Sequence, residues 1–182
     1  MKLIYRLRGW LMVPPMIFIL LCTRHECENA LLVWGLGGLT FGVGLALRLW
    51  PQMHLHHRLR VPKTLTMTGP YAYVRNPMYL ANTALLAGTS MLAELFWFVP
   101  FLVLYCALIY TRVIRYEEAH LLRKYGAAYQ EYMARVPRLL PKWTPQETTG
   151  ARVSRYLLPC ILAEAHNLLF LLPFVIKELI AH

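Results

Sequence analysis

The sequence contains no aspartate, and its four cysteines show no paired spacing. Three histidines lie close together, at His54, His56 and His57, but no matching cluster of His, Cys or Asp accompanies them elsewhere. Three of the cysteines lie in or beside apolar runs, where cysteine behaves as a small hydrophobic residue. Without CxxC spacing they indicate neither a disulfide framework nor a zinc site. The sequence therefore predicts no metal centre.

Charge is also scarce. Charged residues make up 15% of the chain and hydrophobic residues 58%, and the mean hydropathy is +0.42, which is too apolar for an ordinary soluble domain. Lys and Arg outnumber the nine glutamates by 19 to 9, for a net charge of +10. Such an excess could indicate nucleic acid, but in a chain this apolar it indicates the cytoplasmic face of a membrane. We predict an all-α integral membrane protein with no nucleic-acid partner.

Five apolar stretches approach the roughly 20 residues that a helix needs to cross a bilayer. The first, Gly9 to Cys22, is long enough when counted from Leu3 with Arg6 and Arg8 snorkelling. No small-x-small cleavage site follows it, which favours a span over a cleaved signal peptide. The others are residues 30–50, 77–93, 95–116 and 156–180. We expect one domain over residues 1–182 with about five transmembrane helices.

Glycines are concentrated in the second stretch. Gly38 and Gly42 have the GxxxG spacing that lets membrane helices approach closely. The GxG at Gly42 and Gly44 is weak support for a nucleotide, and we predict close packing instead.

The basic residues predict the topology. With the N-terminus inside and five spans, every Lys and Arg except Arg24 and Lys177 lies in an inside segment or helix end. This bias orients a membrane protein with its positive side in the cytoplasm. We expect an inner or plasma membrane location, a cytoplasmic N-terminus and a site on the cytoplasmic side.

The stretch from Gly69 to Tyr79 turns a basic loop into an apolar helix. Asn76 stands at the expected N-cap, and Pro77 suits the first helical position, where a missing N–H costs nothing. The unpaired N–H groups of a helix start, beside the Arg75 guanidinium, would suit a carboxylate or phosphate. A plain loop-to-helix junction at the membrane interface is the alternative.

A glutamate pair, Glu117 and Glu118, leaves the fourth apolar stretch on the same predicted side of the membrane. The third and fourth stretches should form an antiparallel hairpin, because the turn between them is short. Residues distant in sequence would then meet at one end of the hairpin. A solvated helix end pairing with Lys and Arg is the other interpretation. Gly126 should end the fourth helix, and Tyr129 and Tyr132 should share a face of the next.

Several motifs occur in the order typical of one family. They are Arg48-Leu49-Trp50, Gly69-Pro70-Tyr71, Arg75-Asn76-Pro77-Met78-Tyr79, Glu117-Glu118, Tyr125-Gly126, Tyr129, Tyr132 and Arg135-Val136-Pro137. Over about residues 40–141 the chain resembles the isoprenylcysteine carboxyl methyltransferase and phospholipid methyltransferase families. The additional helix at 156–180 lies outside the resemblance.

The resemblance implies a membrane methyltransferase that uses S-adenosyl-L-methionine and acts on a lipid-like acceptor. It implies acceptor or catalytic roles for Arg112, Arg115 and Glu118. The implied cofactor-binding residues are Thr64, Leu65, Tyr71, Arg75, Asn76, Pro77, Met78, Tyr79, Glu117 and Glu118. Asn76 departs from the commoner His, and because an amide does not ionise near neutral pH, an acid–base role at this position is in doubt.

The acceptor and the oligomeric state are not predicted. Methyl transfer is an in-line displacement, so a carboxylate acceptor needs no base, whereas an amine, phenol or thiol must lose a proton. Glu164 and Asn167, at i and i+3 in the last stretch, would line the acceptor entrance or form an interhelical hydrogen bond. Two other classes remain open: a nicotinamide-dependent membrane reductase and a non-catalytic scaffold. The candidate proton acceptors are Glu117, Glu118, His120 and Glu164, and the reductase would use Arg58, Arg60 and Lys63 for a phosphate.

Overall fold

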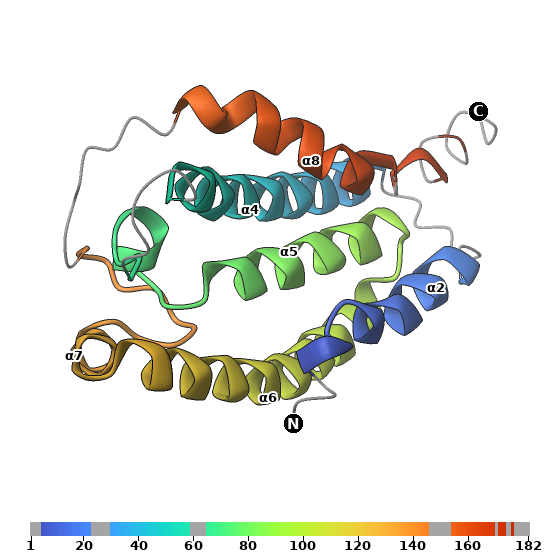
Figure 1. Cartoon of the computed structure of the whole chain (residues 1–182). Helices are drawn as coiled ribbons and strands as arrows, with labels where there is room; N and C mark the ends of the chain where they lie inside the picture. The colour runs from blue at the N-terminus through green and yellow to red at the C-terminus, as the bar shows by residue number, and fades with distance from the viewer. Residues whose placement is uncertain are drawn as a thin grey trace.

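The computed structural model of the chain describes residues 5–22, 30–58, 65–145, 154–169, 171–173 and 176. Every regular element in these ranges is helical. Figure 1 shows α8 lying along α4, α4 along α5, and α2 and α6 on the other side of α5. The all-α prediction is confirmed for the described part of the chain.

The central pair is α4 (Gly38–Arg58) and α5 (Pro77–Leu92). α4 continues a helical segment formed by α3 (Ala30–Leu32) and a π-helical turn, η2 (Val33–Gly37). Close packing at glycine is confirmed, but at other positions than the GxxxG pair. A Cβ on Gly44 would lie 2.7 Å from the Leu85 nitrogen, and one on Gly88 would lie 2.5 Å from the Phe41 nitrogen. The glycines at this contact admit no larger side chain without a shift of the backbone.

The GxxxG prediction itself is wrong. A Cβ added to Gly38 or Gly42 would meet no atom within 4 Å, whereas one on Gly37 would lie 3.0 Å from Leu92. Gly37 and Gly44 are seven residues apart, two helical turns, and so share a face. The face toward α5 is therefore one position away from the predicted one.

The predicted helical hairpin is present. α5 ends at Leu92, a 3-10 turn η4 (Phe96–Phe98) follows, and α6 (Val99–Tyr125) returns antiparallel to α5. Gly126, with φ +55°, ends α6, as expected, and α7 (Ala127–Arg135) begins directly after it. The core between the helices consists of Leu86, Ala87, Leu102, Cys106, Tyr110 and Ile114.

Two further helices complete the bundle. A 3-10 turn η1 (Trp10–Met12) leads into α2 (Val13–Leu21), whose Phe18 ring lies 4.6 Å from the Phe98 ring. Near the C-terminus, η5 (Ser154–Tyr156) leads into α8 (Leu157–Leu169), which packs on α4. The loop before α5 carries one more 3-10 turn, η3 (Gly69–Ala72).

Two helical segments are long and apolar enough to cross a bilayer, Val33–Leu55 and Phe96–Tyr125. Trp10–Leu21 is a shorter apolar segment, and α5, at 16 residues, spans about 24 Å of the ~30 Å hydrocarbon core. Two of the five predicted spans thus meet the test, and the other three stay predictions.

One helix boundary was predicted too early. α4 continues to Arg58 instead of ending near Trp50, although Pro51 removes one backbone donor. Pro51 is fully buried, so tertiary packing outweighs the local cost of proline.

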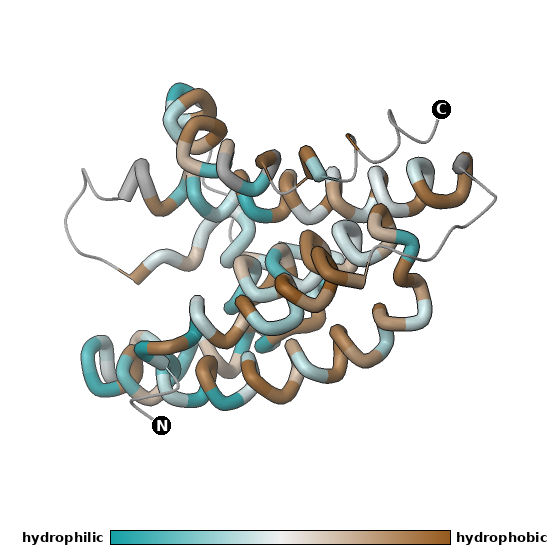
Figure 2. Tube along the Cα trace, turned by 90° about the vertical axis from the view of Figure 1, so that its right-hand side faces the viewer, coloured by the Kyte–Doolittle hydropathy of each residue, from teal (hydrophilic) through white to brown (hydrophobic). Residues whose placement is uncertain are grey.

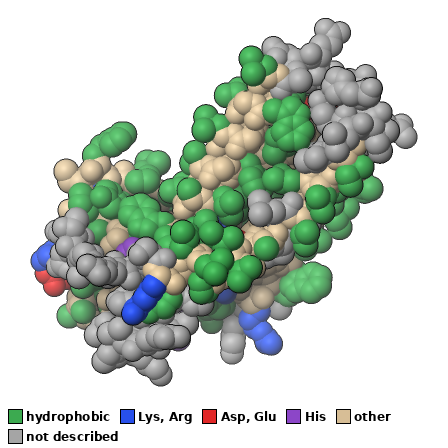
Figure 3. Space-filling view, turned by 90° about the horizontal axis from the view of Figure 1, so that it is seen from above, with side chains coloured by type: hydrophobic (Ala, Val, Ile, Leu, Met, Phe, Trp, Pro, Cys, Tyr) green, Lys and Arg blue, Asp and Glu red, His purple; other side chains and the backbone are tan. Residues whose placement is uncertain are grey.

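The surface carries many large apolar side chains. Figure 2 shows hydrophilic segments gathered toward one end of the bundle, and Figure 3 shows a face covered by apolar side chains with charged ones at one end. Exposed apolar area on this scale is unusual in a soluble monomer and typical of contact with lipid. The fold therefore indicates membrane association. Residues that expose more than half of their surface include Leu31, Leu39, Phe101, Leu104, Leu158 and Leu162.

Candidate active site

The start of α5 is held against the segment that follows α7. The Arg75 N–H donates to the Pro137 carbonyl at 2.9 Å, and the Lys142 N–H donates to the Tyr73 carbonyl at 3.0 Å. Asn76 is the N-cap residue of α5, as predicted, but its side chain makes no capping bond; Nδ2 donates to the Arg138 carbonyl at 3.1 Å. The capping hydrogen bond expected of the Asn76 side chain is thus replaced by a hydrogen bond to a distant segment of the chain.

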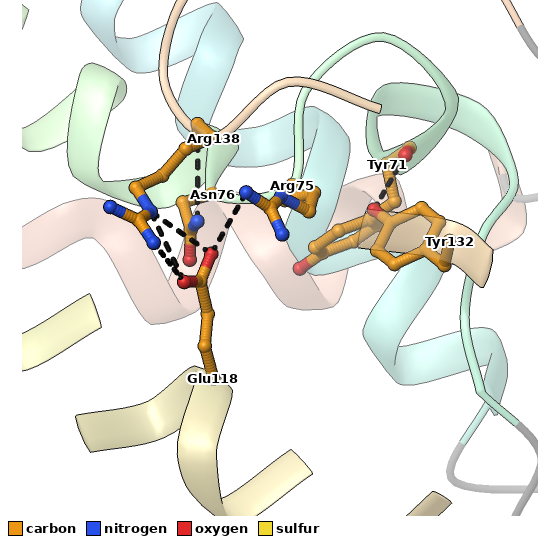
Figure 4. A network of polar contacts seen from close by, with 6 residues as sticks. All are labelled: Tyr71, Arg75, Asn76, Glu118, Tyr132 and Arg138. Carbon is orange, nitrogen blue, oxygen red and sulfur yellow. Dashed lines mark hydrogen bonds and ion pairs between the residues drawn. The ribbon is translucent and has the colours of Figure 1, made fainter. Parts of the chain in front are cut away.

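Glu118 of α6 is the centre of a buried ion-pair network. It is 5% exposed and accepts from Arg138, with Nη2 at 2.6 Å and Nε at 3.1 and 3.2 Å from its two oxygens. Nη2 of Arg75 lies 3.3 Å from the same carboxylate, and Figure 4 shows both guanidinium groups directed at it. The hydrogen bonds to Glu118 raise the pKa of Arg138. Glu118 therefore ties three separate segments together.

Arg75 is only partly satisfied by this network. Its side chain is 8% exposed, and its Nε and Nη1 are buried without a hydrogen-bond partner among the described residues. Buried donors in folded proteins are nearly always paired with protein, water or a ligand. These two nitrogens can therefore donate hydrogen bonds to an anionic group.

Glu117, next to Glu118, has a different environment. Tyr79 Oη donates to Glu117 Oε2 at 2.8 Å, and no other hydrogen bond to this carboxylate comes from the described residues. The Tyr79 ring also lies 4.8 Å from the Tyr110 ring. Glu117 is half-buried, so it presents a fixed carboxylate with acceptor capacity to spare. The predicted meeting of the Arg75 and Glu117 stretches is confirmed.

A tyrosine pair from α7 closes the other side of the loop before α5. Tyr129 and Tyr132 are both buried, on one face as predicted, with ring centroids 5.9 Å apart. Tyr132 Oη donates to the Tyr71 carbonyl at 2.7 Å, and Leu65 packs on the pair. Burial raises the pKa of Tyr129 to about 12, so this phenol stays neutral and acts as part of a wall.

A cavity of about 390 Å³ lies beside Tyr79. Along α5 it is bordered by residues spaced three or four apart, which share one helix face. Its remaining walls come from the N-terminal segment, α4, α6 and α8. The lining residues are Arg8, Gly9, Met12, Val13, Met16, Phe41, Arg48, Tyr79, Asn82, Leu85, Leu86, Thr89, Tyr110 and Asn167.

Most predicted cofactor residues in the described ranges do come together at this end of the hairpin. Pro77 is the first residue of α5, as expected, and Met78 follows it in the first turn. Thr64 lies outside the described residues. The members of the group are Leu65, Tyr71, Arg75, Asn76, Pro77, Met78, Tyr79, Glu117 and Glu118.

Arg112 and Arg115 are not brought to the cavity. Both are exposed, and neither borders it. α6 buries Cys106, Tyr110 and Ile114 at four-residue spacing, so the two arginines lie on another face. Two arginines were missed by the sequence prediction: Arg138, which pairs with Glu118, and Arg48, which borders the cavity. Arg48 had been noted only as a helix exit, and nothing in the spacing linked Arg138 to Glu118.

Of the three clustered histidines, only His54 has a described side chain, and its role is structural. His54 is 7% exposed, its Nδ1 lies 3.1 Å from the Trp50 carbonyl oxygen, and its ring lies against Gly69. The side chains of His56 and His57 lie outside the described set. Within that set, no group of three or more His, Cys, Asp or Glu could hold a metal ion.

The sequence that forms this site matches a known family. The model of the phospholipid methyltransferase family matches residues 35–128, half of the chain. The chain belongs to this family. The matched residues include Arg75, Tyr79 and the Glu117-Glu118 pair. Membership confirms the resemblance of the sequence motifs to this family.

Two relatives carry names of another kind. The chain is 32% identical over 145 residues to the nickel-cobalt-cadmium resistance protein NccN of Alcaligenes xylosoxydans xylosoxydans, covering 76% of this chain and 65% of the relative. It is 33% identical over 103 residues to the cobalt-zinc-cadmium resistance protein CzcN of Cupriavidus metallidurans, covering 56% and 46%. The chain thus spans about half to two thirds of the length of these relatives. No solved structure matches it.

Proposed function

We propose that the protein transfers a methyl group from S-adenosylmethionine to a lipid-like acceptor at the cytoplasmic edge of the membrane. The observation that carries the proposal is the Tyr79–Glu117 hydrogen bond at the end of the hairpin where Arg75 is buried with unsatisfied donors. The basic inside segments favour a cytoplasmic N-terminus and a cytoplasmic site.

The residues present suit the cofactor's polar groups. S-adenosylmethionine carries a carboxylate, an amine, a sulfonium and a ribose diol. The two unpaired nitrogens of Arg75 suit the carboxylate, because each carries an N–H that can donate a charge-assisted hydrogen bond to an anion. The free acceptor capacity of Glu117 suits the amine or the diol. Leu65 and Tyr71, backed by the α7 tyrosines, would form a wall for the remainder.

When bound, the cofactor supplies a methyl group already activated by its sulfonium for in-line displacement. The chain then has to align the two reactants and exclude water, and it needs no covalent intermediate. Tyr79 fixes the Glu117 carboxylate, and the Glu118–Arg138 pair fixes Arg75. The apolar walls of the cavity keep water from the acceptor.

The two neighbouring glutamates would have different roles. Glu118 accepts hydrogen bonds on both oxygens from arginine, so it positions Arg75 and takes no proton. Glu117 is linked to the cavity through its hydrogen bond with Tyr79 and has acceptor capacity left. If the acceptor must lose a proton, that role falls to Glu117.

The test is binding of S-adenosylhomocysteine to the purified protein in nanodiscs, measured by calorimetry and by melting temperature. A ligand of the native state must stabilise it, by about 2.7 kcal/mol at a hundredfold excess over Kd. NADPH, the ligand of the reductase alternative, should give no saturable binding. A well-folded sample whose melting temperature is unmoved by millimolar S-adenosylhomocysteine would contradict the proposal. If S-adenosylhomocysteine does bind, supplying membranes with labelled methyl donor and analysing the lipids would identify the acceptor.

A further inference from the structure

A polar cluster lies inside the bundle, away from Glu117 and Glu118. Glu164 of α8 is 2% exposed and accepts from Arg48 Nε at 2.5 Å, and also from the side-chain amides of Gln52 and Asn167. Arg48 Nη1 donates to Asn82 Oδ1 of α5. Glu164 and Asn167 lie beyond the residues that the family model matches. This part of the protein is thus not explained by the family match.

Arg48 has donor capacity that this cluster does not use. Nε donates to Glu164 and Nη1 donates to Asn82, and neither of these hydrogen bonds uses Nη2. The Arg48 side chain is 21% exposed and borders the cavity. Ionised groups within apolar helices are costly and mark functional sites more often than structural ones. Arg48 therefore borders the cavity with one guanidinium nitrogen that these hydrogen bonds leave available to a ligand.

The cavity is amphiphilic. Its α5 wall extends from Tyr79 to Thr89, ten residues or about 15 Å of helix. Met16, Phe41, Leu85 and Leu86 give it an apolar portion, and its volume is within the range of about 300–1,000 Å³ typical of small-molecule sites. Among the described lining residues there are two arginines, Arg8 and Arg48, and no carboxylate or imidazole.

This inventory of charges decides the chemistry of the head group. Glu164 compensates Arg48, and Arg8 interacts electrostatically with Glu117, but both carboxylates lie outside the lining, which itself holds only the two arginines as charged groups. A cationic head group would meet two guanidinium groups and no acid in the lining, whereas an anionic one would meet donors on both.

We propose that Arg48, held in place by Glu164, binds the anionic head group of the amphiphilic acceptor, which makes α8 part of the acceptor site. The inference rests on the proposed function. Arg48 contacts the acceptor, and Glu164 is a positioning residue: it supplies the countercharge and holds the Arg48 guanidinium at the cavity wall through Nε. The tail of the acceptor lies along Phe41 and Leu85, with its head toward Tyr79.

The test uses the full chain in nanodiscs and four probes with the same dodecyl chain: dodecanoate, dodecyl phosphate, dodecanol and dodecylamine. Calorimetric titrations are corrected with empty nanodiscs. Arg48→Gln alone would leave Glu164 buried and unpaired and so could unfold the protein. The decisive variant is therefore Arg48→Gln with Glu164→Gln, which removes both charges, keeps polar side chains and leaves the net charge unchanged. Arg123→Gln, an exposed arginine of α6, is the matched control.

Wild type should bind one or both anionic probes at least tenfold more tightly than dodecanol, and a preference between the two assigns a carboxylate or a phosphate. The double variant should lose this preference, and Arg123→Gln should keep it. Glu164→Gln alone should also shift the ratio of anionic to neutral affinity, because it removes the countercharge of Arg48 and loosens its guanidinium, whereas a merely structural Glu164 would leave that ratio unchanged. An unchanged ratio in the double variant, or wild-type preference for dodecanol or dodecylamine, would overturn the inference. Affinity for S-adenosylhomocysteine is measured on the same samples, so failure of the proposed function is seen separately.

Discussion

Tyr79 of α5 and Glu117 of α6 lie 38 residues apart in the chain and are joined by a 2.8 Å hydrogen bond at one end of the helical hairpin. The same tyrosine borders the cavity. A single side chain therefore connects the carboxylate proposed to hold the methyl donor with the space proposed to hold the acceptor. This arrangement makes both ends of the bond testable.

Glu117→Gln should weaken binding of S-adenosylhomocysteine by roughly 1.5–3 kcal/mol, the range for hydrogen bonds to charged groups. The substitution keeps the shape of the side chain and removes its charge. Calorimetry in nanodiscs measures the change. Glu131→Gln is the control, because Glu131 is 61% exposed and pairs only with Arg135 along α7. If the control lost as much affinity as Glu117→Gln, the site would not be at the hairpin end.

Tyr79→Phe should also weaken cofactor binding, because Glu117 loses the donor that orients it. Combined with Glu117→Gln it should show a smaller loss than the sum of the two, by about 0.5 kcal/mol or more, since residues in one hydrogen-bonded pair are not additive. Tyr105→Phe, which removes a hydroxyl bonded to the Leu11 carbonyl at 2.7 Å, should leave affinity unchanged. Strict additivity in this cycle would show that Tyr79 does not act through Glu117.

Glu118→Gln should mainly affect stability. It leaves Arg75, 8% exposed, without its countercharge, and breaking a buried ion pair from one side costs about 3–5 kcal/mol. We expect the lower end of that range, because Arg138 is 36% exposed and can be rehydrated. The free energy of unfolding in detergent measures it. Arg135→Gln breaks an exposed pair worth less than about 1 kcal/mol, and equal losses in the two variants would refute the buried network.

Local signals in the sequence were sufficient to predict the helix ends that border the site. Pro77 and Gly126 have backbone preferences that favour a helix start and a helix end, and both occur as expected. The short turn after α5 made the return of α6 predictable, and with it the meeting of Arg75 with the glutamates. These features follow from residue type and spacing alone.

Side-chain partners across long separations were not predictable in this way. Arg48 and Glu164 are 116 residues apart, and no periodicity links them. Asn76 is a residue type that commonly caps a helix, but its side-chain amide donates to the Arg138 carbonyl instead. Arg112 and Arg115 were assigned by their closeness to the glutamates in sequence, whereas the packed face of α6 decides which side chains reach the cavity.

The contact between Gly69 and His54 gives a last prediction about the loop that precedes α5. Gly69 has φ +63°, and a Cβ there would lie 2.1 Å from His54 Nε2. Gly69→Ala should therefore cost about 1–2 kcal/mol of backbone strain plus the cost of displacing a buried ring. His54 is thus unsuitable as a neutral position in binding experiments, although it has no assigned ligand role.

A double-mutant cycle separates the two costs. His54→Ala should relieve part of the loss caused by Gly69→Ala, because it removes the clash and leaves only the strain. Gly126→Ala is the matched control, since Gly126 also has positive φ but a Cβ there meets nothing within 4 Å. His54→Ala should show no coupling with Gly126→Ala in unfolding measurements. Equal coupling at both glycines, or none at either, would mean that the His54 ring does not pack on the loop, and that this loop is held before α5 by other contacts.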